Sequence, residues 1–308
     1  MNLSDITKIN FGSAGISAVY NGGIKLWPKG SELSNKVMKF TIVSGNTWDH
    51  MALIAYTADN KLIKPVKKDA TGWTYDEEVA YIKCEGYEYQ SGKNILTFEG
   101  FPKAVKLKAG KNMFYNNSKC TNISTANMDT SECTDINNMF NGCSSLTSLD
   151  LSNFNTSKVT DMGGMFNGCS GLTSLDLSNW NTSKVDFMNH MFYGCSGLTS
   201  LDVSHFDTLD VYTVQSMFAS CRSLTSLDLS NWNISFINIM DWMFSNCISL
   251  ATLDLSNWDT SRVTSMKSMF NNCTSLKTVK MTNCSQDTKD KIRAALDEAG
   301  LTSTVITE

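Results

Sequence analysis

Hydrophobic and polar positions recur along this chain with a period of 26 residues. The dipeptide Met-Phe begins at residues 113, 139, 165, 191, 217, 243 and 269, with no insertion or deletion between these positions. A strict period of this length is the signature of a repeat protein, in which each unit buries its apolar face only by stacking on its neighbours. The pattern therefore predicts an elongated array over residues 113–284.

The leucine pattern L-x-x-L-x-L, as in Leu146/Leu149/Leu151 and Leu224/Leu227/Leu229, is typical of the strand segment of a leucine-rich repeat, and the first unit is degenerate, with Cys120 where later units have Leu. In residues 147–152 apolar and polar residues alternate, which predicts a strand with one buried face. Val159, Met162 and Phe166 follow at helical spacing, with Thr156 and Ser157 as candidate N-caps, so we expect a short helix. The expected fold is an α/β leucine-rich-repeat solenoid of seven coils, with a parallel strand ladder and short helices.

Glycine or asparagine recurs where each of these short helices should end, a position that favours a left-handed backbone. Ser220 is the exception in this column, which comprises Gly142, Gly168, Gly194, Ser220, Asn246 and Asn272.

The segments at the two ends of the array have different patterns. Residues 285–308 are expected to form a C-terminal cap, with a helix from Ser285 to Ala299, a stop at Gly300 and an edge strand over Ser303–Thr307. Residues 1–29 predict a short β anchor segment with a turn at Gly22-Gly23, followed by a linker over 28–31. Residues 30–112 predict a small antiparallel β domain. Its strand-like runs are Val37–Val43, Met51–Tyr56, Leu62–Val66, Val79–Cys84, Ile95–Phe98 and Ala104–Leu107.

Charge supports a boundary near residue 112. Residues 1–112 hold 15 lysines and 11 acidic residues, whereas residues 113–308 hold 11 basic and 19 acidic residues. Neither part is basic enough to predict binding to nucleic acid. No stretch approaches the roughly 20 apolar residues needed to cross a bilayer, so we expect no membrane insertion. The first residues also lack the basic and apolar regions of an export signal.

Several columns of the repeat are explained by packing. We expect the cysteine column to be buried thiols, with disulfides between adjacent coils as the alternative. No cysteines are paired at zinc-ligand spacing, so no metal site is predicted. The asparagine column should satisfy backbone groups at a coil corner, and the aromatic column should lie in the core. These columns are Cys143, Cys169, Cys195, Cys221, Cys247 and Cys273; Asn153, Asn179, Asn231, Asn257 and Asn283, interrupted by His205; and Phe154, Trp180, Phe206, Trp232 and Trp258.

An aspartate column lies on the outward face of the predicted strands. Like charges one rung apart repel each other, so water, salt or neighbouring hydroxyls must compensate them. The column is either a solvated face or a strip that binds cations or a ligand, and it comprises Asp150, Asp176, Asp202, Asp228 and Asp254.

Residues that break the repeat are the remaining candidates for function. Tyr212, Phe236 and Ile237 stand where other units have Thr, Lys or Val, and Trp242 stands in a column of Asn, Gly, His and Ser. Exposed aromatic residues close together suggest a contact surface, so Tyr212, Phe236 and Trp242 are candidate partner-binding residues. Local repacking is the alternative.

Catalytic constellations are missing from the sequence. It has three histidines and no nucleophile elbow, phosphate-binding loop or dinucleotide-binding turn. We therefore expect no catalytic residue, no cofactor and no enzymatic activity, with a carbohydrate-active enzyme as the remote alternative.

One unit reads Met165-Phe166, Cys169, Leu172, Leu175-Asp176-Leu177-Ser178, Trp180-Asn181-Thr182-Ser183 and Val185. It resembles the BspA-like leucine-rich repeats of bacterial surface proteins, and the resemblance covers residues 113–284. It implies a curved solenoid with parallel strands, used for adhesion to host matrix proteins or to other cells. It carries no catalytic residue over to this chain.

The opening segment, which includes Ile6–Phe11 and Ile24–Trp27, resembles short N-terminal segments of structural proteins from tailed bacteriophages. Combined with the adhesin-type repeat, this predicts a virion fibre or decoration protein made in the bacterial cytoplasm, where unpaired cysteines are normal. Residues 1–29 would contact other virion proteins, and the solenoid would bind a protein or glycan on a host cell surface. Homo-oligomers remain open. The alternative is a bacterial cell-surface adhesin whose export signal has been removed.

Overall fold

The computed structural model describes the array completely except for one residue, and describes the N-terminal part as separate strands. The described residues are 8–12, 15–21, 24–27, 37–42, 51–56, 61–63, 67–69, 72–74, 81–87, 95–98, 106–125 and 127–308. The predicted turn at Gly22-Gly23 and the predicted linker over 28–31 lie outside these residues.

The N-terminal strands form three sheets. The first is antiparallel, in the order β1-β2-β3, and the others have the orders β12-β10-β4-β8-β7 and β11-β9-β5-β6. The bounds are β1 Lys8–Gly12, β2 Gly15–Asn21, β3 Ile24–Trp27, β4 Val37–Ile42, β5 Met51–Tyr56, β6 Leu62–Ile63, β7 Lys67–Asp69, β8 Gly72–Thr74, β9 Tyr81–Tyr87, β10 Ile95–Phe98, β11 Lys106–Gly110 and β12 Asn122–Ile123.

The parallel pairing of β9 with β11 corrects the prediction of a small antiparallel domain over residues 30–112. β9 pairs with β11, and β10 pairs with β12, in parallel registers. β11 also bonds to the first coil, because the Gly110 amide donates to the Asp135 carbonyl at 2.8 Å. The two sheets that contain β11 and β12 therefore continue directly into the coiled part of the chain.

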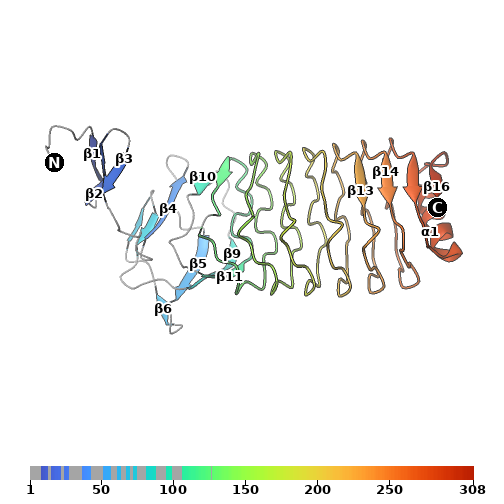
Figure 1. Ribbon diagram of the computed structural model, residues 1–308, viewed down its shortest axis with the longest axis horizontal. Coiled ribbons are helices and arrows are strands. Elements are labelled where there is room, and N and C mark those ends of the chain that lie inside the picture. Colours follow the sequence, from blue (N-terminus) through green and yellow to red (C-terminus); the bar gives the residue numbers. More distant parts are fainter. Residues whose placement is uncertain are drawn as a thin grey trace.

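From β11 onward the chain winds into coils that follow one another along the long axis of the molecule (Figure 1). One parallel ladder joins β13 (Ser226–Asp228), β14 (Thr252–Asp254), β15 (Thr278–Lys280) and β16 (Val305–Thr307), so Leu227, Leu253, Val279 and Ile306 are neighbours. A second ladder of single bridges runs through Asp135, Asp161, Phe187, Thr213, Ile239 and Ser265. The parallel ladder of a leucine-rich-repeat-like α/β fold is thus present.

The short helix predicted in each coil is wrong for the described part of the array. The segment after Ile136 is a run of turns, in which Asn138 and Gly142 have φ angles of 54° and 77°. Left-handed residues four apart cannot belong to an α-helix. Alternate amides donate to the next coil instead, as Phe140 does to Met165 at 2.9 Å.

The backbone hydrogen bonds that would form a helix therefore join the coils to one another. Thr156 consequently caps no helix. Its hydroxyl donates to the Asn181 carbonyl of the next coil at 2.8 Å, and the Ser157 amide is bound by the Asn155 side chain at 3.0 Å. The prediction of a left-handed backbone at the Gly and Asn positions of the column from Gly142 to Asn272 is correct, and Ser220, the exception in residue type, adopts the same conformation at 62°.

Stacked apolar columns form the core between the two ladders. Phe114, Phe140, Phe166, Phe192 and Phe218 are fully buried, and successive rings lie 5.5 to 5.8 Å apart at small angles. The predicted aromatic column is also buried. Two of its indole nitrogens, those of Trp232 and Trp258, donate to backbone carbonyls at 2.9 and 3.0 Å.

One α-helix follows the last coil, α1 (Gln286–Glu298), and it lies at the C-terminal end of the stack (Figure 1). Ser285 accepts a hydrogen bond from the Thr288 amide, and Gly300 leaves the helix at φ 74°. The helix buries Ile292, Ala295 and Leu296. Among the described residues, no helix has the length and hydropathy needed to cross a bilayer.

Candidate binding face

Large apolar side chains are exposed together on three consecutive coils, beside the second ladder. Phe187, Tyr212 and Phe236 are 43%, 53% and 42% exposed, and Leu209 and Ile239 are exposed to a similar extent. We call these five residues the apolar ridge. Exposing such side chains to water is unfavourable, at roughly 25 cal/mol per Å² of apolar surface. A cluster of this kind on a soluble surface marks an interaction site.

The ladder places the members of the ridge near one another. Phe187 bridges to Thr213, which bridges to Ile239. The rings of Phe187 and Tyr212 have centroids 6.2 Å apart. The Tyr212 amide donates to the Asp186 carbonyl at 2.9 Å, so residues from neighbouring coils share this face.

A cation lies at the C-terminal end of the ridge. The guanidinium carbon of Arg262 is 5.1 Å from the centroid of the Phe236 ring, within the range of a cation–π interaction. Arg262 comes from the following coil, where it occupies the same column as Phe236. The ridge therefore ends in a residue pair of a kind that is common in protein interfaces.

Trp242 is distinguished by its backbone. It is 37% exposed and has a φ of 56°, and its amide donates to the Lys267 carbonyl at 2.9 Å. A bulky residue in the left-handed region is strained, and such strain is concentrated at functional sites. Trp242 follows Ile239 by three residues in the sequence. Among the described residues, its ring makes no contact with the rings of Tyr212 or Phe236.

The sequence prediction found only part of this face. Phe187, Leu209 and Ile239 were missed, although each replaces the Asp, Ser or Thr of its column and so gave the same signal as Tyr212. Ile237, which also breaks the repeat, is fully buried and belongs to the core.

The aspartate column is directed outward, and each carboxylate is bound by its own coil. Asp150, Asp176, Asp202 and Asp228 are exposed, and each accepts the amide of the serine two residues later at 2.9 to 3.0 Å. Hydrogen bonds from these serines hold the pKa of Asp150, Asp176 and Asp202 below the ordinary range. Each carboxylate thus stabilises a turn.

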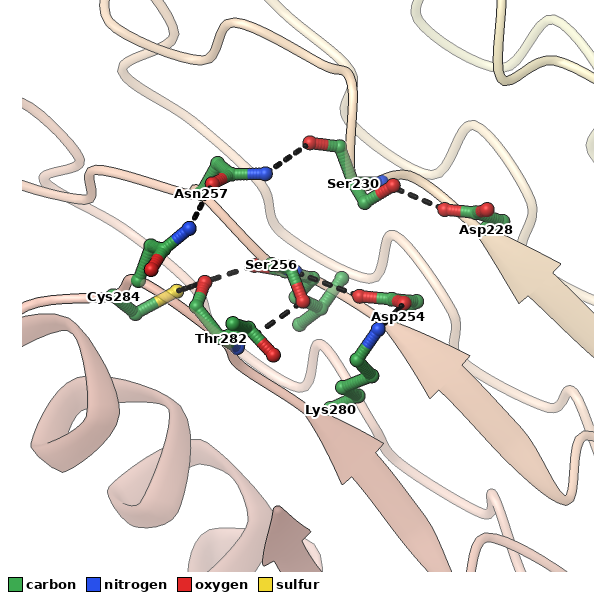
Figure 2. Close-up of polar contacts among 10 residues, drawn as sticks. Asp228, Ser230, Asp254, Ser256, Asn257, Lys280, Thr282 and Cys284 are labelled. Carbon is green, nitrogen blue, oxygen red and sulfur yellow. Dashed lines mark hydrogen bonds and ion pairs between the residues drawn. The ribbon is translucent and has the colours of Figure 1, made fainter. Parts of the chain in front are cut away.

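Figure 2 shows how the aspartate column ends. Lys280 donates to Asp254 at 3.0 Å, and the Ser256 amide donates to the other carboxylate oxygen at 2.9 Å. Burial raises the pKa of Asp254, but the bonds from Ser256 and Lys280 outweigh burial and lower it overall. Within the described part of the chain, no three His, Cys, Asp or Glu side chains are grouped to hold a metal ion.

The asparagine column has the predicted role of bonding to backbone. Asn153 donates to the Thr125 carbonyl at 2.7 Å, and Asn257 donates to the Ser230 carbonyl at 3.0 Å (Figure 2). At the interrupted position, His205 Nε2 lies 3.0 Å from the Leu177 carbonyl oxygen. These side chains satisfy carbonyl groups at the coil corner.

The cysteine column consists of free, buried thiols, so disulfides between adjacent coils are not formed there. Each sulfur donates to a phenylalanine carbonyl of the preceding coil, as Cys169 does to Phe140 at 3.1 Å. Burial raises the pKa of Cys169 from 9.0 to about 12. These thiols are protonated at neutral pH and are unsuited to nucleophilic chemistry.

Comparisons with known proteins gave a family match and several similar solved structures. The family described as "Mycoplasma protein of unknown function, DUF285" matches residues 108–223 and 195–299. A leucine-rich repeat protein from Bacteroides ovatus is similar at 15% identity, over 72% of this chain and 74% of that protein, with a TM-score of 0.24. A leucine-rich repeat protein of Leptospira interrogans is similar at 12% identity, over 67% of this chain and 59% of that one, with a TM-score of 0.25. No curated protein matches.

Proposed function

Since the chain belongs to the family described as "Mycoplasma protein of unknown function, DUF285", whose description assigns no activity, we propose a function from its exposed face: non-catalytic binding of a partner protein through the apolar ridge. The observation that carries this proposal is that large apolar side chains occupy the exposed columns of the ridge on three consecutive coils. In the other coils the same columns hold small or polar residues, such as Thr160, Asp161 and Lys184. Packing of the solenoid therefore does not require the apolar side chains.

A protein partner fits the ridge better than a glycan does. Aromatic rings, aliphatic side chains and an arginine are the residues enriched in the buried centres of protein interfaces. Phe187 and Tyr212 lie side by side, and Arg262 lies over the Phe236 ring, so the exposed surface combines aromatic rings with one cation.

We propose that this binding serves adhesion, in one of two settings. In the first, the protein is part of a bacteriophage virion, made in the bacterial cytoplasm and attached to other virion proteins through residues 1–29. In the second, it is an adhesin on a bacterial cell surface. Mass spectrometry of purified particles and of bacterial envelope fractions separates them, because the protein should be abundant in only one of the two.

The binding proposal is tested by replacing residues of the ridge with those that other coils have in the same columns. The variant Phe187→Asp, Tyr212→Thr, Phe236→Lys, Ile239→Ser copies residues that neighbouring coils hold in these columns, so it should fold. We expect its retention on immobilised envelope proteins to fall by at least about tenfold, as for the loss of interface hot spots.

The matched control is Lys158→Ser, Thr160→Ser, which changes exposed positions of the same kind in an earlier coil. It should bind like the parent protein. Treating the immobilised sample with protease should abolish binding, whereas periodate should not. Equal binding by the ridge variant contradicts the role of the ridge, and sensitivity to periodate alone contradicts the protein partner.

A further inference from the structure

The second ladder ends at the last coil, where four backbone amides donate to no described residue. In the preceding coil, the amides of Met240, Trp242, Phe244 and Asn246 donate to carbonyls of the next coil at 2.7 to 3.0 Å. The equivalent residues of the last coil are Met266, Ser268, Phe270 and Asn272. Among the described residues, no hydrogen-bond acceptor faces the amides of these four.

This open edge is specific to one side of one end of the array. At the same end, the other ladder is completed by β16, which pairs with β15. At the N-terminal end, the second ladder is covered, because β11 bridges to Asp129 and pairs with β9. The elements after the last coil therefore close only one of the two ladders.

A groove of about 380 Å³ lies beside this edge, between the last coil and α1. Val263 and Met266 line it and are only partly buried, whereas Val185 and Met188, which occupy the same columns in an earlier coil, are almost completely buried. Ala294 lines the opposite wall, from α1. The groove thus combines apolar side chains with unsatisfied backbone donors.

The lysines that line the groove outnumber the acids by one, and the Asp241 carboxylate beside it accepts from the Lys267 amide at 2.9 Å. Lys267 and Lys291 line it together with a single acid, Glu298. Lys291 is held by the Thr260 carbonyl and by Asp287, each at 3.1 Å. Lys267 is exposed, and the ion pairs of the described residues near the groove involve other lysines and arginines, not Lys267. An occupant that carries carboxylates would complement this charge.

We propose that the groove binds an extended, acidic peptide segment of a partner protein, which adds to the second ladder as a further rung. Its carbonyl groups would accept from Met266 and Ser268, its apolar side chains would cover Val263 and Met266, and its carboxylates would face Lys267. This is strand addition at an open edge, in which backbone hydrogen bonds give affinity and alternate side chains give specificity. A second copy of the chain fits less well, because two identical donor-rich edges would oppose donor to donor.

The experiment uses the full chain and a fluorescein-labelled peptide of alternating valine and aspartate, followed by fluorescence anisotropy. Lys267→Glu should weaken binding by about fivefold, the upper range for an exposed ion pair. Lys277→Glu, the matched control, changes an exposed lysine that does not line the groove and should bind like the parent. Ala294→Trp fills the groove and should abolish binding.

Amide hydrogen exchange then locates the peptide. In the free protein, Met266 and Ser268 should exchange quickly and Met240 and Trp242 slowly, and the peptide should protect the first two. The ridge variant should bind the peptide normally, because none of its four substituted residues lines the groove. The proposal is overturned by no binding, by equal binding of a valine–asparagine peptide, by unchanged exchange at Met266, or by sedimentation that shows a second copy on this edge.

Discussion

At the scale of single residues, one column of the repeat has a left-handed backbone, and Trp242 is the largest side chain in it. Asn138, Gly164 and Ser268 occupy this column with φ angles of 54°, 62° and 53°. Small side chains, and asparagine in particular, tolerate that conformation. Trp242 adopts it at 56°, which costs of the order of 1–3 kcal/mol for a non-glycine residue. The strained backbone at Trp242 therefore lowers the stability of the fold at a position where the ring is exposed.

We predict that two substitutions at Trp242 change the free energy of unfolding by different amounts. Trp242→Gly should keep the free energy of unfolding within about 1 kcal/mol of the parent, because Gly164 already fills the same column. Trp242→Val should lower it by about 2 kcal/mol, because a β-branched residue is strained at positive φ. Urea unfolding measures both, with the same pair at Ser268 as the control. A glycine variant less stable than the valine variant would refute the assignment of strain.

At the scale of elements, the aspartate column is a set of turn-stabilising carboxylates and offers no metal site among the described residues. Each aspartate accepts the amide of the serine that follows it by two residues. The bonds lower the pKa of Asp150, Asp176 and Asp202, so folding favours the charged form. Successive carboxylates of the column lie one rung apart, and the last of them, Asp254, is paired with Lys280.

This arrangement predicts a loss of stability in acid. Because the folded-state pKa values are lowered, the stabilisation is complete above the ordinary value of 3.8 and is lost as the pH falls through the folded values. The variant Asp150→Asn, Asp176→Asn, Asp202→Asn keeps an acceptor oxygen but does not titrate. Free aspartate has a pKa of about 3.9. The melting temperature of the variant should therefore fall less steeply below about pH 4.5 than that of the parent protein. Parallel curves would show that the column does not contribute.

At the scale of the whole molecule, stability should be distributed along the stack. Every coil contributes the same buried columns, and hydrogen bonds of both ladders run only between adjacent coils. Such an array behaves as a chain of nearest-neighbour interactions, and it tolerates the loss of a complete unit.

Deletion of residues 139–164 should therefore leave a folded protein, because Met165 follows Asn138 in the register of the repeat. The urea m value should fall by about a tenth, since less surface is exposed on unfolding. Deletion of residues 139–151, half a unit, shifts every later column and should prevent cooperative unfolding. Circular dichroism during urea titration distinguishes the two, and a half-unit deletion as stable as the full one would contradict the nearest-neighbour description.

The sequence by itself determined the register, the buried columns, α1 and the closing strand β16, because a period of 26 residues places equivalent residues in neighbouring coils. It did not determine the turn runs. Helical spacing and successive turns both direct Val159, Met162 and Phe166 inward, and only the neighbouring coil decides where the amides donate.

The candidate sites divide in the same way. Tyr212, Phe236 and Trp242 were visible as breaks in the repeat, but the pairing of Phe187 with Tyr212 and of Phe236 with Arg262 depends on contacts between coils. The groove beside Met266 had no signal in the sequence. It exists because α1 and β16 follow the last coil and close one ladder, while no described residue accepts from the amides at the end of the second ladder.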